Sequence, residues 1–337
     1  MINLYSDTQT RPTEDMRRAI AAADVGDEQR GQDPTTLRLQ GRVAELLGHE
    51  AGLFLPTGTM CNQISFRLHA RPGGDELILD RTAHPIIAEA GGPAQQAGLM
   101  INPLDGDGGI FTPEQLVAAL RPRGDRYKPR SRLVSVEQTT NMGGGRVWPL
   151  EAVQGVLQAA RGHGLRAHMD GARLMNAVVA SGVPAARFAG GFDTAWLDFT
   201  KGLGAPVGAV LCGSRELIGE AWRWKQMVGG AFRQSGIVAA GCLYALDHHV
   251  ERLAEDHELA RLLADGLAEL GAEVIQPESN IVIFAVPDAG AFVEQMGRRG
   301  VELSGTPDGR VRAVTHLDVD RAGVEEALQA ARTVLLA

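Results

Sequence analysis

Apolar and polar positions alternate along the chain in a way that predicts repeated strand and helix units. From about residue 35 to residue 213, short apolar runs are separated by segments that carry apolar residues at helical spacing. This alternation is typical of an α/β fold, in which helices cover a largely parallel sheet. The predicted strands span residues 51–56, 76–80, 132–138, 166–170, 194–200 and 208–213, and the predicted helices span residues 35–48, 112–120 and 150–164.

The last part of the chain has a different pattern, which predicts a smaller α+β unit. A long helical stretch begins near Ser235 and runs towards Leu270, and strands and helices then alternate beyond Gly271. We therefore predict a large domain at residues 1–270 and a small C-terminal domain at residues 271–337. The predicted elements of the small domain are strands at 272–276, 280–287 and 311–317, a helix at 291–299 and a closing helix.

Composition and charge argue against several classes of function. The formal net charge is -8, and the chain has no basic block, which argues against binding to nucleic acid or to an anionic membrane. No apolar run reaches the roughly 18 residues of a membrane span, and the N-terminus lacks the layout of a secretory signal. We therefore expect a cytoplasmic protein. The three cysteines lie far apart, so neither a disulfide framework nor a metal site is expected.

Two residues at the ends of predicted strands suggest a cofactor with a basic ring nitrogen. Lys201 follows an apolar strand and precedes the turn GLGAPVG, and Asp170 ends the strand RAHMD. Considered separately, Lys201 would be interpreted as an ordinary surface lysine and Asp170 as the cap of the next helix. Together they suit pyridoxal 5'-phosphate, because a lysine amine forms an imine with an aldehyde and a carboxylate keeps a pyridine nitrogen protonated. The sequence therefore predicts Lys201 and Asp170 as catalytic and cofactor-binding residues.

A phosphate site is predicted where PTGTMCNQ follows a strand and begins a helix. Gly58 allows a tight turn, and Thr59 offers a hydroxyl and an amide at the helix N-terminus. Thr200 supplies a further hydroxyl beside the predicted Schiff-base lysine. Lys225 and Arg233 are cationic candidates for the same phosphate, within the chain or across a subunit boundary. An exposed basic face accounts for these two residues almost equally well.

Three further residues are predicted to contact the cofactor ring or an anionic substrate. His84 follows the strand at 76–80, where an imidazole can stack on a planar ring and also transfer a proton. Arg173 and Arg312 suit a carboxylate, because a guanidinium group matches its geometry with two parallel donors. Without a fold, each arginine alone reads as a surface residue.

Several blocks of the sequence resemble the L-threonine aldolases of the aspartate aminotransferase superfamily, which have pyridoxal phosphate fold type I. The resemblance implies a large domain with a mostly parallel seven-stranded sheet and a smaller α+β domain. It implies that segment 1–34 contributes to the active site and to subunit contacts. It also implies a homotetramer of dimers whose active sites borrow residues from the neighbouring subunit. The matching blocks are SDTQTRPT, GQDPT, AHPIIAEAGG, HMDGARLMNA, TKGLGAPVG, GGAFRQSG and RAVTHLDV.

The resemblance also assigns roles to individual residues. Lys201 resembles the Schiff-base lysine, Asp170 the partner of the pyridine nitrogen, and His84 the stacking histidine. Gly58 and Thr59 resemble the phosphate turn. The residues that fall where the family holds the substrate carboxylate are Ser6, Arg173 and Arg312, and Arg173 is also expected to contact the cofactor.

Two positions depart from the pattern of this family. Thr140 stands where the family usually has a histidine near the substrate hydroxyl, and Arg30 stands where it usually has a tyrosine. Both positions lie near the expected side-chain pocket, so we predict Thr140 and Arg30 as substrate-binding residues. The changes leave the cofactor chemistry intact and leave open which aldehyde and which stereoisomer at Cβ the pocket prefers.

The function that these residues predict is reversible cleavage of an L-β-hydroxy-α-amino acid into glycine and an aldehyde. In this hypothesis Arg312 and Arg173 bind the carboxylate of the amino acid, and His84, directly or through water, accepts the β-hydroxyl proton. One alternative is another reaction of the same cofactor, such as β-elimination, transamination or racemisation. A second is an aldolase that prefers bulky aromatic aldehydes, as a phenylserine-cleaving relative would. A third is a catalytically silent relative that serves as a binding or scaffold protein.

Overall fold

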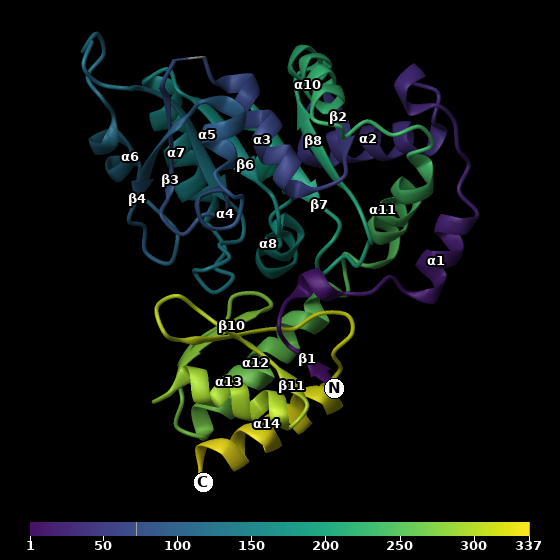
Figure 1. Ribbon diagram of the computed structural model, residues 1–337, viewed down its shortest axis with the longest axis vertical. Coiled ribbons are helices and arrows are strands. Elements are labelled where there is room, and N and C mark those ends of the chain that lie inside the picture. Colours follow the sequence, from purple (N-terminus) through teal and green to yellow (C-terminus); the bar gives the residue numbers. More distant parts are fainter. Residues whose placement is uncertain (72, 337) are drawn as a thin grey trace.

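The computed structural model describes residues 1–71 and 73–336 and places the predicted strands of the large domain in one sheet (Figure 1). The order is β2-β8-β7-β6-β5-β3-β4. Strand β8 runs antiparallel to both of its neighbours, whereas the other adjacent pairs are parallel. The predicted mostly parallel sheet of seven strands is therefore confirmed. The strands are β2 (Ala51–Leu55), β3 (Asp75–Asp80), β4 (Met100–Leu104), β5 (Arg130–Glu137), β6 (Arg166–Asp170), β7 (Thr194–Asp198) and β8 (Ala209–Gly213).

Helices cover both faces of this sheet. Successive strand residues point to opposite faces, and apolar residues on each face are buried under helices. Phe54 and Leu197 pack in one apolar cluster, whereas their neighbours Leu53 and Trp196 pack in another on the opposite face. Helices α2 (Pro34–Leu47), α7 (Leu150–Gly162) and α11 (Gly236–His248) contribute to the first cluster, and α3 (Gly58–His69) and α10 (Arg215–Met227) contribute to the second. The remaining helices of this part are α1 (Glu14–Ala21), α4 (His84–Ile87), α5 (Gly92–Ala97), α6 (Pro113–Ala119), α8 (Leu174–Ser181) and α9 (Ala185–Ala189).

Two differences from the sequence prediction concern the edge of the large sheet and the helical stretch after Ser235. Strand β4 was not predicted, because its segment MINPL contains Asn102 and Pro103 and lies mostly half-buried at the edge of the sheet. A proline is tolerated at an edge, where its missing N–H breaks no ladder hydrogen bond. The single long helix predicted from Ser235 is two helices, α11 and α12 (Leu253–Glu269). Helix α11 packs in the large core and α12 mainly in a second, smaller core, so the chain passes between the two units at this break.

The smaller unit is the predicted α+β arrangement, with an antiparallel sheet in the order β12-β13-β10-β9. The N-terminal strand β1 (Ile2–Asn3) pairs with β11 (Val301–Glu302), and Leu4 packs in the smaller core. Helix α12 contacts α8 as well as this core, and the boundary at residue 270 stays a prediction. The other elements are β9 (Glu273–Ile275), β10 (Ile281–Ala285), α13 (Ala289–Arg298), β12 (Ser304–Gly305), β13 (Val311–Val314) and α14 (Arg321–Leu335).

The described part of the chain, residues 1–71 and 73–336, contains no helix with both the length and the apolar character that crossing a membrane requires.

Candidate active site

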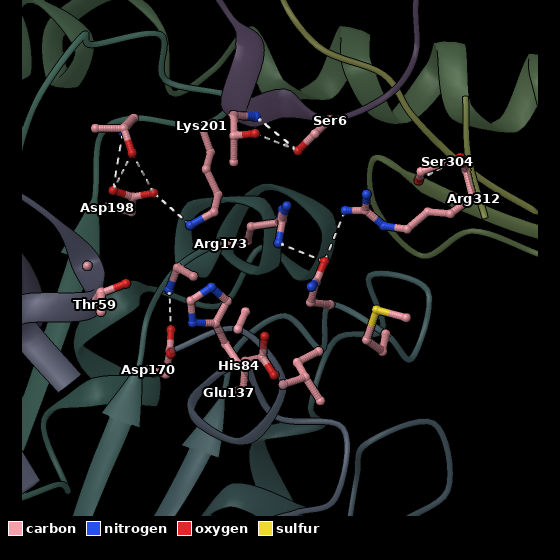
Figure 2. A pocket seen from close by; sticks show the side chains of 18 of the residues that line it. Ser6, Thr59, His84, Glu137, Asp170, Arg173, Asp198, Lys201, Ser304 and Arg312 are labelled. Carbon is pink, nitrogen blue, oxygen red and sulfur yellow. Dashed lines mark hydrogen bonds and ion pairs between the residues drawn. The ribbon is translucent and has the colours of Figure 1, made fainter. Parts of the chain in front are cut away.

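A cavity of about 500 Å³ lies at the carboxyl ends of β5, β6 and β7, between the large and the small unit (Figure 2). The carboxyl edge of a parallel sheet is where α/β proteins commonly bind ligands, because the loops diverge there and helices begin. The N-terminal segment and the β12–β13 region of the small unit complete the wall of the cavity. The predicted residues that line it are Ser6, Gly58, Thr59, His84, Asp170, Arg173, Thr200, Lys201 and Arg312.

Lys201 extends into this cavity from the loop after β7 (Figure 2). Its Nζ donates a hydrogen bond of 2.8 Å to Oδ2 of Asp198, the last residue of β7. The hydroxyl of Thr200 donates to Oδ1 of the same carboxylate at 3.0 Å. Asp198 was missed by the sequence analysis, although its position at a strand end, three residues before the lysine, was a usable signal. The pair holds the amine in a defined position while the side chain stays partly accessible from the cavity.

Asp170 ends β6 and is buried on the floor of the same cavity. Oδ2 accepts a hydrogen bond of 2.8 Å from Nδ2 of Asn62, and Oδ1 accepts one of 3.0 Å from the backbone N–H of Ala172. Burial raises the pKa of Asp170, because a charged carboxylate is less well solvated there. A cationic ring nitrogen placed beside this oxygen pair would compensate the buried charge.

The first residue of α3, Gly58, lies so close to the sheet that only glycine fits there. A Cβ added to Gly58 would lie 2.2 Å from Cη2 of Trp196, so the backbone packs directly on the indole ring. The Thr57 hydroxyl accepts from the backbone N–H of Met60 and caps the helix. Other amides of this first turn have no partner within the helix, and Thr59 adds a hydroxyl beside them. Such a helix N-terminus at a cavity wall suits a phosphate.

His84 begins α4, and its ring lies at the cavity wall near Asp170 and Glu137 (Figure 2). Nδ1 lies 2.9 Å from Oε1 of Glu89, a carboxylate that is buried. This hydrogen bond outweighs the effect of burial and raises the pKa of His84, and the negative charge of Asp170 adds to the increase. Glu89 was also missed, because its position five residues after the histidine has no strand or helix period that would link the two.

Arg173 forms a buried ion pair with Asp7, a residue of the N-terminal segment. Nε donates to Oδ2 at 2.8 Å, and Nη2 donates to Oδ1 at 2.7 Å. Burial alone would raise the pKa of Asp7, but the Arg173 guanidinium outweighs it and holds this pKa well below its usual range. The sequence prediction missed Asp7, which lies 166 positions from its partner. The Nη1 group of Arg173 lies 3.4 Å from Oδ1 of Asn141, at the cavity wall.

Arg312 reaches the cavity from β13 of the small unit, and its hydrogen bonds are incomplete. Nη2 donates to Oδ1 of Asn141 at 3.0 Å and Nη1 donates to the carbonyl of Tyr5 at 3.2 Å. Nε is buried and has no partner among the described residues. Burial lowers the pKa of Arg312 to about 10, and repulsion by Arg173 contributes. A carboxylate ligand in the cavity would therefore meet a largely desolvated guanidinium group.

Glu137 is a second cavity-lining carboxyl group that the sequence analysis did not single out. It ends β5 directly opposite Asp170 in the parallel pair. Burial and the negative charge of Asp170 raise the pKa of Glu137 to about 8, so the carboxyl group holds a proton at neutral pH. Its position as the last residue of the strand RLVSVE is the same signal that identified Asp170.

Four predicted residues do not line this cavity. Lys225 is buried, forms an ion pair with Glu28 and lies over the ring of Trp222, so the structure does not place it at the phosphate turn. The reason is that this basic residue points into the protein, where a carboxylate from a distant segment neutralises it. The other three are Thr140, which is buried beside Asn141, and the exposed residues Arg30 and Arg233.

Comparison with known proteins identifies the family to which this chain belongs. The chain matches the family model described as beta-eliminating lyase over residues 3–289. It is 41% identical over 328 residues to the low specificity L-threonine aldolase of Escherichia coli K12, covering 97% of each protein.

Solved structures with the same fold include a threonine aldolase of Leishmania major, with a TM-score of 0.86 and 18% identity over 99% of this chain and 100% of that one. Another is a structure described as SPT with PLP, with a TM-score of 0.75 and 18% identity over 98% of this chain and 86% of that one. These two likenesses concern the fold, whereas the family model and the similarity to the bacterial aldolase extend along the sequence. The chain therefore belongs to the beta-eliminating lyase family, among the L-threonine aldolases.

Proposed function

We propose that this protein is a pyridoxal phosphate-dependent aldolase that cleaves L-threonine, L-allo-threonine and related L-β-hydroxy-α-amino acids into glycine and an aldehyde. The observation that carries the proposal is that Lys201 and Asp170, which lie at the ends of different strands, line one cavity together with His84 and Arg312. A lysine, a buried carboxylate, an imidazole and a guanidinium group are the side chains that this chemistry uses. The similarity to the low specificity L-threonine aldolase of Escherichia coli supports the same substrate class.

The residues of the cavity fit the cofactor. Lys201 would bind its aldehyde carbon, Asp170 would face its ring nitrogen, and the turn at Gly58 and Thr59 would hold its phosphate. His84 would lie against the ring. Bound in this way, pyridoxal phosphate supplies a positively charged ring that accepts the electron pair released at Cα when a bond to that carbon breaks.

The remaining residues bind the amino acid and move its protons. Arg312, whose guanidinium group lines the cavity, would bind the substrate carboxylate, and Arg173 and Ser6 also line this cavity (Figure 2). In retro-aldol cleavage the β-hydroxyl loses its proton, the bond between Cα and Cβ breaks and Cα gains a proton. Because Nδ1 of His84 is bound to Glu89, Nε2 is the nitrogen that is free to accept the hydroxyl proton.

We further propose that the enzyme works as a homotetramer in the cytoplasm. Arg30 and Arg233 are exposed and lie outside the cavity of their own chain, so an adjacent subunit is the route by which they would reach an active site. Met227 and Ile237, in the same region as Arg233, are exposed apolar residues of the kind that subunit contacts cover. The three cysteines are buried free thiols, which suits a reducing compartment.

A product assay tests the proposed function. The purified protein, incubated with pyridoxal phosphate, is given L-threonine, L-allo-threonine or L-phenylserine, and the products are identified. We expect glycine and acetaldehyde from the first two substrates. Ammonia and a keto acid would instead indicate β-elimination, and turnover of phenylserine alone would indicate an aldolase for aromatic aldehydes. A protein that stays colourless with the cofactor and inactive would contradict the proposal.

A further inference from the structure

Asn62 lies at the centre of a buried hydrogen-bond network below the cavity. Its Nδ2 donates to Oδ2 of Asp170 at 2.8 Å and to Oε1 of Glu89 at 2.7 Å. Its Oδ1 accepts from the indole Nε1 of Trp196 at 2.8 Å. The same Glu89 oxygen that accepts from Asn62 lies 2.9 Å from Nδ1 of His84. The network therefore connects the residue expected against the cofactor ring with the carboxylate expected at its nitrogen.

The donors and acceptors in this network can be assigned from chemistry alone. An indole nitrogen is only a donor, so the atom of Asn62 that faces Trp196 is its oxygen, and its NH₂ group must face the two carboxylates. Nε2 of His168 lies 3.0 Å from the same Asn62 oxygen and must then carry a hydrogen. Burial lowers the pKa of His168, which leaves this imidazole neutral with Nδ1 as an acceptor for the Thr194 hydroxyl at 2.8 Å.

The orientation of Asn62 also determines the state of His84. Oε1 of Glu89 accepts from Asn62, and as an acceptor it requires a hydrogen on Nδ1 of His84. The second oxygen of Glu89 is buried without a partner among the described residues. The acidic groups that face His84 are Glu89, Asp170 and Glu137. Of these, Glu89 is the one that forms a hydrogen bond with the ring.

We propose that Glu89 is a positioning residue for His84 and that Asn62 ties this carboxylate to Asp170, so that one buried network sets both contacts to the cofactor ring. Glu89 holds Nδ1 as the donor and leaves Nε2 for the cavity. Asn62, oriented by Trp196, keeps two carboxylates apart by donating one hydrogen to each. The cofactor role of the network rests on the proposed function, whereas its effect on the His84 imidazole does not.

The first test is an NMR titration of the histidine rings in the full-length protein without cofactor, comparing wild type with Glu89→Gln. Glutamine keeps an oxygen that accepts from His84 and removes the charge. We expect the pKa of His84 to be lower in the variant, with the hydrogen still on Nδ1 in the neutral ring. Glu76→Gln, which changes a buried glutamate paired with Arg121 far from this cavity, is the matched control and should leave His84 unchanged. An unchanged pKa of His84 in Glu89→Gln would overturn the proposal.

The second test measures cofactor affinity in Asn62→Leu, with Asn176→Leu as its control. Both asparagines are buried, and Asn176 bonds His257 instead of a cavity residue. Loss of a hydrogen bond to a charged group predicts a roughly 10- to 100-fold higher dissociation constant for pyridoxal phosphate in Asn62→Leu. Equal affinities in the two folded variants would show that the network does not position Asp170. Because the histidine titration needs neither cofactor nor substrate, a wrong proposed function would leave its result intact.

Discussion

Replacing Asp7 by asparagine tests the buried ion pair that joins the N-terminal segment to the large unit. Asp7 binds Nε and Nη2 of Arg173 at 2.8 and 2.7 Å and accepts a third hydrogen bond, of 3.1 Å, from Asn280 of the small unit. An asparagine side chain has similar size, but its NH₂ group would face another donor, and the Arg173 charge would be left uncompensated in the interior. Breaking one side of such a buried pair costs about 3–5 kcal/mol of the free energy of unfolding.

The assay is guanidinium-induced unfolding at pH 7 of wild type, Asp7→Asn and Asp318→Asn. Asp318 pairs with Arg11, whose side chain is 78% exposed, so this control should lose less than about 1 kcal/mol. The double variant Asp7→Asn, Arg173→Met removes the buried charge and should recover part of the loss. A free energy of unfolding for Asp7→Asn within about 1 kcal/mol of wild type would refute the reasoning.

The pH dependence gives an independent check on the same pair. The pKa of Asp7 is lower in the folded protein than its ordinary value of 3.8, so its contribution is present at neutral pH. The contribution is lost as the pH falls from that ordinary value towards the folded-state pKa, because the proton then binds the unfolded chain more readily. Asp7→Asn should therefore lose less stability than wild type when the pH is lowered below about 4. Parallel curves for the two proteins would mean that Asp7 does not carry this dependence.

Three further variants test the cavity. Lys201→Ala should abolish turnover and the visible absorbance of the bound cofactor; normal turnover with a retained band would contradict its role. Gly58→Ala places a Cβ 2.2 Å from Cη2 of Trp196, and this overpacking should lower the free energy of unfolding by about 1–3 kcal/mol, measured by guanidinium denaturation; an unchanged stability would show that the start of α3 can move away from the indole ring. Because the pKa of Glu137 is raised from 4.5 to about 8, wild-type stability should fall as the pH rises between these values. Glu137→Gln should flatten that part of the profile in unfolding experiments, and an unchanged slope would show that Glu137 does not hold the proton.

The pattern of the sequence was sufficient for six of the seven strands of the large sheet and for two residues at or just after strand ends, Asp170 and Lys201. Largely apolar runs such as TAWLD predict buried strands, because both faces of a strand are buried when helices cover both sides of the sheet. Once a strand is located, the residue at its carboxyl end is located as well, and this is why Asp170 and Lys201 could be identified before the fold was known. Strand β4 was not predicted, because this edge strand contains a proline and lacks the apolar pattern.

The pairing of charges was decided by the tertiary structure. The sequence offers Arg173, Arg312 and Lys225 as candidate cations for bound anions. In the structure Arg173 pairs with Asp7 and Lys225 pairs with Glu28. Nε of Arg312 has no hydrogen-bond partner among residues 1–71 and 73–336. The partners are separated by 166 and 197 positions, and no local period relates them. Hydrophobic periodicity predicts which side of a helix or strand is buried, because the local backbone geometry determines which residues share one face. Which polar groups meet inside depends on how distant segments pack, and only the folded chain determines it.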